Sequence, residues 1–169
     1  MSLMRRTQRI EGCQAVLGYD FNDSDLLWEA LQAAGSPVFA VGRRFLPDGN
    51  KRLAILGDAV LKLILIRDGY VHDESRGTGA TIAALVEKLM CDPGIMNRNV
   101  STVGSNTNLD SVGRRNGLNS FVEGNPSQQG VVPPNTMAAT VEAILGAVFL
   151  DSGLESVAEV METLGLVPA

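Results

Sequence analysis

Cysteine, histidine and aromatic residues are scarce in this chain. Its 169 residues include two Cys, one His, one Trp, two Tyr and five Phe. Aromatics make up 5% of the chain and hydrophobic residues 45%, so the core must be built mainly from Leu, Val, Ile, Ala and Met. Cys13 and Cys91 are too few for a disulfide framework, which favours core thiols and an intracellular, reducing compartment.

Long hydrophobic runs are absent as well. The longest stretch, from Ala59 to Ile66, is interrupted by Lys62 and is far below the roughly 20 residues that a membrane-spanning helix needs. Arg5 and Arg6 are followed by no apolar run, so we expect no signal peptide. The sequence therefore predicts a protein without membrane partners.

Basic residues are outnumbered by acidic ones. Lys and Arg total 14, Asp and Glu total 19, and the net charge is −5. A free-standing protein that binds nucleic acid tightly normally carries a basic surface. The charge balance argues against tight independent binding and leaves weak or assisted RNA binding open.

Helical periodicity is what the chain does have. Its length suits one compact domain, and apolar residues recur at spacings of three and four. We predict a single all-α domain over residues 1–169, with a core from about 17 to 164. The helices are expected at 8–17, 25–34, 51–70, 80–91, 95–103, 105–116, 137–150 and 154–164.

The helix expected at 51–70 is apolar on almost every side between Leu53 and Ile66, which predicts a central, buried helix. Glycine and proline mark loops at 35–49 and 123–134. Residues 71–94 are expected to form an extended loop or insertion, beginning with the polar stretch V-H-D-E-S-R-G-T-G. Asn135 or Thr136 is expected to cap the helix at 137–150.

Two stretches carry a more specific pattern. Residues 50–61 read N-K-R-L-A-I-L-G-D-A-V-L, and residues 139–151 read A-T-V-E-A-I-L-G-A-V-F-L-D. The first resembles the signature helix of the ribonuclease III family, N-E-R-L-E-F-L-G-D, and the second resembles that family's D-T-V-E-A-L-I-G-A helix. Further matches at 17–31 and 104–109 follow in the family's order. The resemblance implies the all-α ribonuclease III endonuclease-domain fold.

The chemistry of the family's pattern rests on acids. Carboxylates spaced three and four residues apart share one helix face, and two such helices can build an oxygen cage for Mg²⁺ or Mn²⁺. Two such ions activate a water and stabilise the leaving oxygen of a phosphodiester. The resemblance implies catalytic and metal-binding acids at Asp58 and Glu142, while Lys51, Ala54 and Ala139 stand where the family has further acids.

One more family acid belongs to the intervening segment, which is longer here. Counting forward from Asp58 arrives at Thr78, and counting back from Ser105 arrives at Pro93, beside Asp92. Neither counted position is an acid. Asp92 and Glu74 are therefore candidate replacement ligands for a metal ion, together with Asp73.

Structural explanations compete with each functional one. The structural alternative for Asp58 is pairing with Lys51, Arg52 or a backbone donor, and for Glu142 it is a salt bridge to Lys51. His72, the lone histidine, has no orienting partner in the sequence and is expected to be solvated. The neighbouring Arg114 and Arg115 are weak candidates for contact with RNA phosphate, although paired arginines are usually surface residues.

Two functions remain open at this point. The first, which we favour, is a ribonuclease III-like module that associates with double-stranded or structured RNA as a binding or scaffold protein, with a metal site too depleted for efficient hydrolysis. The second is an active, metal-dependent endoribonuclease that uses Asp58, Glu142 and non-standard ligands. The resemblance also implies a two-fold homodimer formed through an apolar surface around the helix at 51–70.

Overall fold

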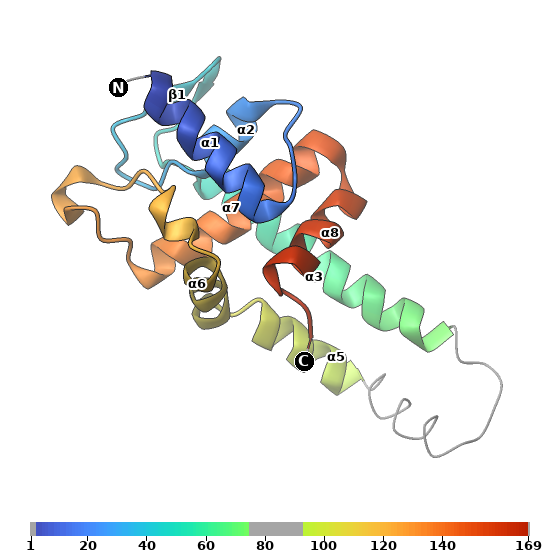
Figure 1. Cartoon of the computed structure of the whole chain (residues 1–169). Helices are drawn as coiled ribbons and strands as arrows, with labels where there is room; N and C mark the ends of the chain where they lie inside the picture. The colour runs from blue at the N-terminus through green and yellow to red at the C-terminus, as the bar shows by residue number, and fades with distance from the viewer. Residues whose placement is uncertain (1–2, 75–92, 169) are drawn as a thin grey trace.

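The computed structural model describes residues 3–74 and 93–168, and its regular structure in these ranges is almost entirely helical (Figure 1). The all-α prediction is confirmed, apart from one small hairpin. The elements are α1 (Leu3–Leu17), α2 (Ser24–Ala30), β1 (Ala40–Val41), β2 (Arg44–Phe45), α3 (Lys51–Glu74), α5 (Pro93–Val103), α6 (Asn106–Arg115), η1 (Leu118–Ser120), η2 (Pro126–Gln128), α7 (Pro134–Ser152) and α8 (Leu154–Leu164).

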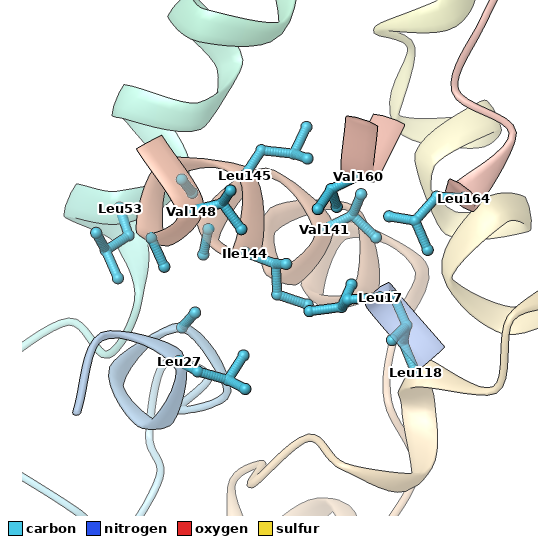
Figure 2. Packing of buried hydrophobic residues seen from close by; sticks show 14 of the residues in the cluster. Leu17, Leu27, Leu53, Leu118, Val141, Ile144, Leu145, Val148, Val160 and Leu164 are labelled. Carbon is cyan, nitrogen blue, oxygen red and sulfur yellow. The ribbon is translucent and has the colours of Figure 1, made fainter. Parts of the chain in front are cut away.

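Helix α7 is the centre of the domain. It packs against α2, α3, α6 and α8, and ten of its residues are buried. Figure 2 shows Leu17, Leu27 and Val160 converging on its side chains from three different helices. Trp28 is the one aromatic residue among the buried core residues, so the expected aliphatic core is confirmed.

The composition of α3 predicted a helix that is buried on every side, and the structure shows that this is wrong. Leu61 and Ile64 face the core, but Ile55 is 73% exposed and Leu63 is 51% exposed. An apolar side chain on a helix is buried only where a neighbouring element covers it, and α7 and α5 cover part of the circumference of α3. Composition alone could not distinguish a central helix from one that carries an uncovered apolar face.

Helix α3 also continues further than predicted, through Glu74. Residues 71–74, which were expected in a loop, are therefore helical, because V-H-D-E contains no residue that breaks a helix. Pro93 and Gly94, at the other end of the expected loop, open α5. The helix predicted at 80–91 lies outside the described residues. In the part of the chain that the structure describes, no helix combines the length and hydrophobicity needed to cross a membrane.

Two other element boundaries differ from prediction for identifiable reasons. Helix α2 ends at Ala30 because the backbone of 31–33 pairs with Glu123 instead: the Ala33 amide donates to the Glu123 carbonyl and the Glu123 amide to the Leu31 carbonyl, both at 2.9 Å. Helix α7 starts at Pro134, with Pro133 before it and no capping side chain, so the cap expected from Asn135 or Thr136 is wrong. Proline suits a first helical position because it has no N–H to leave unpaired.

The hairpin of β1 and β2 lies in the loop expected at 35–49. Its strands pair antiparallel, with Ala40 opposite Phe45 and Val41 opposite Arg44. The two connecting residues are Gly42, with φ of 56°, and Arg43, which is the pattern of a type II′ turn. Strands of two residues carry too little alternation to be predicted from sequence.

Asn50 anchors the start of α3. This buried residue donates from Nδ2 to the Ala30 carbonyl at 2.7 Å and to the Thr140 hydroxyl at 3.3 Å. Its own carbonyl accepts from the Ala54 amide, beginning the helix. One side chain thus joins the ends of α2 and α3 to α7.

Glycines allow α3 and α7 to cross with their backbones in contact. A Cβ placed on Gly57 would overlap the Glu142 carbonyl oxygen, and one placed on Gly146 would overlap the Leu53 carbonyl oxygen. Neither obstacle is a flexible side chain that could move aside. The crossing therefore requires a residue without a side chain on each helix.

We expect Gly57→Ala to destabilise the protein by about 3 kcal/mol or more, because the helices must separate to admit the methyl group. Urea unfolding followed by circular dichroism measures this loss. Gly124→Ala is the matched control, since a Cβ there meets only the Gln128 side chain at 3.7 Å, and its effect should stay within about 0.5 kcal/mol. Equal stability of the two variants would contradict the contact argument.

Candidate functional site

An open hollow of about 480 Å³ lies at the crossing of α3 and α7, beside the start of α6. It contains both acids that sequence analysis singled out. The residues that line it are Lys51, Ala54, Ile55, Asp58, Lys62, Gly104, Asn106 and Glu142.

One face of α3 supplies most of these residues. Lys51, Ala54, Asp58 and Lys62 follow one another at spacings of three, four and four, so they lie in a row along the helix. Glu142 reaches the same hollow from α7, because its own carbonyl touches α3 at Gly57. The close crossing therefore brings Asp58 and Glu142 to one hollow, while their role as catalytic or metal-binding acids stays a prediction.

Asp58 has a cationic partner, but not the one expected. Lys62 Nζ lies 2.7 Å from Asp58 Oδ2, one helical turn further along α3. No ion pair joins Lys51 to either carboxylate among the described residues, so the suggested pairing of Lys51 with Asp58 or Glu142 is wrong. An acid four residues before a lysine is a known stabilising spacing, and that signal could have identified Lys62.

Glu142 is half-buried and makes no ion pair within the described parts of the chain. The pKa of its carboxyl group is raised to about 7, mainly by burial and in part by the nearby negative charge of Asp58, while the Lys62 ammonium partly opposes both effects. The two acids thus differ: Asp58 is paired with a cation, whereas Glu142 sits where its charge is disfavoured.

The residues of the hollow do not fit a pair of divalent cations. Such ions need several oxygen ligands each, and the hollow offers two carboxylates, one of them already bonded to Lys62. Within 3–74 and 93–168, no three His, Cys, Asp or Glu side chains are grouped so that they could hold a metal ion. Lys51 and Ala54 occupy the hollow with a cation and a methyl group instead.

The other predicted site residues are placed differently. Ala139 lies three residues before Glu142 on α7 and packs, partly buried, against the core. Asp92 lies outside the described residues, and the side chains of His72, Asp73 and Glu74 at the end of α3 are not described. Whether any of these acids replaces a missing ligand stays a prediction.

Arg114 and Arg115 have structural partners. Arg114 pairs with Asp110 at 2.8 Å and donates to the Val132 carbonyl at 2.7 Å. Arg115 donates to the Leu164 carbonyl at 3.2 Å, at the end of α8. Both guanidinium groups thus have structural contacts, and RNA contact by them stays a prediction.

An exposed apolar row lies beside the hollow, on the helix around which the family resemblance implied an apolar surface. Ile55, Leu63, Ile66 and Tyr70 on α3 are all largely exposed, and at 100° per residue they fall within about 80° of arc. Ile55 belongs both to this row and to the hollow. The α3 apolar row, as we call these four residues, therefore adjoins the site.

Fold and site together define an all-α domain of the nuclease type. The model of the ribonuclease-III-like family matches residues 23–167, and the chain belongs to that family.

Individual relatives agree with this assignment. Ribonuclease 3 of Pasteurella multocida is 28% identical over 159 residues, covering 92% of this chain and 60% of the relative. Ribonuclease 3 of Shewanella sediminis is 31% identical over 142 residues, covering 82% of this chain and 52% of the relative. The chain thus spans a little over half the length of these relatives.

A solved structure supports the fold. The nuclease domain of ribonuclease III from Campylobacter jejuni matches with a TM-score of 0.68 and 21% identity, over 92% of this chain and 95% of that one. At this level of identity the likeness establishes the shared fold.

The raised pKa of Glu142 predicts a pH-dependent effect of Glu142→Gln. Between about pH 4.5 and 7, Glu142 keeps a proton in the folded protein that it releases in the unfolded chain. The contribution of Glu142 to the free energy of unfolding of the wild-type protein therefore falls as the pH rises through this range. The Gln variant does not titrate. Its stability relative to wild type should rise across this range and level off above it, by on the order of 1–3 kcal/mol.

Urea unfolding at a series of pH values measures this difference. Glu159→Gln, on an exposed position of α8, controls for the loss of one carboxylate charge. A difference between Glu142→Gln and wild type that is constant with pH would contradict the burial argument.

Proposed function

We propose that this chain is a ribonuclease III-like module that associates with double-stranded or structured RNA and does not carry out efficient two-metal hydrolysis. The observation that carries the proposal is the makeup of the hollow: two carboxylates, one of them bound to Lys62, with Lys51 and Ala54 beside them. Family membership supports RNA as the partner. The net charge of −5 favours weak binding.

The loss of hydrolysis follows from electrostatics. A divalent cation entering beside Asp58 must displace an ammonium group already at hydrogen-bond distance, and Lys51 adds a second positive charge that repels it. Without two bound ions, neither the attacking water nor the leaving oxygen receives the stabilisation that this chemistry needs.

We expect no metal-dependent cleavage when a labelled RNA duplex is incubated with the protein and Mg²⁺ or Mn²⁺. Gel analysis of wild type, Asp58→Ala and Glu142→Ala should give the same uncut pattern, with Pasteurella multocida ribonuclease 3 as the comparison enzyme. Metal-dependent cutting that either substitution abolishes would overturn the proposal. It would favour the active-nuclease alternative, with Asp73, Glu74 or Asp92 as further ligands.

Titration calorimetry with Mn²⁺ tests the site separately from activity. We expect no binding of two ions per protomer in the submillimolar range, in which specific sites are usually occupied. Tight binding of two ions would contradict the depleted-site argument even if no cleavage were seen.

We further propose that the α3 apolar row forms the contact between two copies of the chain. Four neighbouring exposed apolar side chains on one helix are unusual for a surface that faces water alone, and they can meet the same row of a second copy about a two-fold axis. The Campylobacter jejuni nuclease domain also has a region involved in dimer formation.

Leu63→Lys should weaken dimerisation at least about tenfold, because the two-fold interface would bury two unpaired ammonium groups, one from each copy of the chain. Sedimentation velocity over a range of micromolar concentrations measures the association. Val131→Lys, at a 67% exposed position in the loop before α7, is the matched control and should sediment as wild type does. A monomeric wild-type protein would refute the dimer.

A further inference from the structure

Two lysines face the hollow, and neither is fully occupied. Lys62 donates to Asp58 through one of the three N–H groups of its ammonium. The Lys51 side chain makes no hydrogen bond or ion pair with any other described residue, although it lines the same hollow. The site therefore has cationic donors to spare.

The accessibility of these charges matters as much as their number. Lys51 and Lys62 are exposed, while Asp58 and Glu142 are only partly accessible. A group arriving from solvent can therefore reach both lysines. Asn106 contributes an exposed amide at the same opening, where its Nδ2 reaches Asn135 Oδ1 at 3.5 Å.

A two-metal site and this hollow differ in where the positive charge comes from. In a two-metal site, carboxylates hold mobile cations, and the cations meet the phosphate. Here Asp58 holds the ammonium of Lys62, a cation that belongs to the chain and is present at all times. A phosphate oxygen can accept charge-assisted hydrogen bonds from lysine as well as bind to a metal ion.

We propose that the hollow binds a phosphodiester group of RNA directly through Lys51 and Lys62, with no metal ion between protein and phosphate. This inference rests on the proposed function and specifies its binding mode. Asp58 acts as a positioning residue, since it orients Lys62 toward the opening. RNA affinity is then independent of divalent cations, and each lysine contact contributes about 0.9 to the salt dependence of binding.

The first test compares metal conditions. Fluorescence anisotropy of a labelled RNA duplex with the wild-type protein at low salt should give the same affinity in Mg²⁺ and in EDTA at matched ionic strength. Binding that is lost in EDTA would overturn the inference and leave RNA association standing. Absence of binding in both conditions would overturn the proposed RNA association, and the inference with it.

The second test locates the contact. Lys51→Gln should weaken RNA binding about threefold or more and lower the slope of log affinity against log salt by about 1. Lys62→Gln should weaken it further, because it also leaves Asp58 unpaired near the phosphate. Lys51→Arg should retain most of the affinity.

Arg5→Gln is the matched control, since Arg5 is exposed on α1 and does not line the hollow. It removes one positive charge and should leave the salt slope unchanged. Because Lys51 and Lys62 are exposed, urea unfolding should show all three Gln variants folded. Salt slopes of Lys51→Gln and Lys62→Gln equal to wild type would place RNA elsewhere and overturn the inference.

Discussion

The backbone contact between α3 and α7 is the constraint on which the rest of this structure depends. Gly57 and Gly146 let the two helices cross without an intervening side chain. That crossing packs α3 onto the central helix of the domain and sets Asp58 opposite Glu142. The site is thus a consequence of the same contact that holds the core together.

The electrostatics of the hollow follow from what surrounds that crossing. If all the residues that line the hollow on α3 and α7 were acids, the two helices would repel each other unless cations lay between them. Here Lys62 satisfies Asp58 from the same helix, and small or cationic residues stand at Ala54 and Lys51. The helices can therefore stay in contact without a metal ion, although Glu142 remains in an environment that raises its pKa to about 7.

Much of the fold was predictable from local signals. Helix α8 begins and ends as expected, and α2 and α6 begin within one residue of their predicted starts. These features depend on residues a few positions apart. The end of α2 was not predictable, because it depends on pairing with Glu123, about ninety residues away along the chain, and residue spacing within the helix does not report that contact.

The sequence by itself determined the helical class, the family pattern and the two acids Asp58 and Glu142, because helical periodicity and short motifs are local properties. Only the tertiary structure decided which cation meets Asp58, how deeply Glu142 is buried and which side of α3 stays uncovered. Those outcomes depend on distances between side chains and on which surfaces neighbouring helices cover. A linear pattern lists the charges of the site, and packing decides which of them meet.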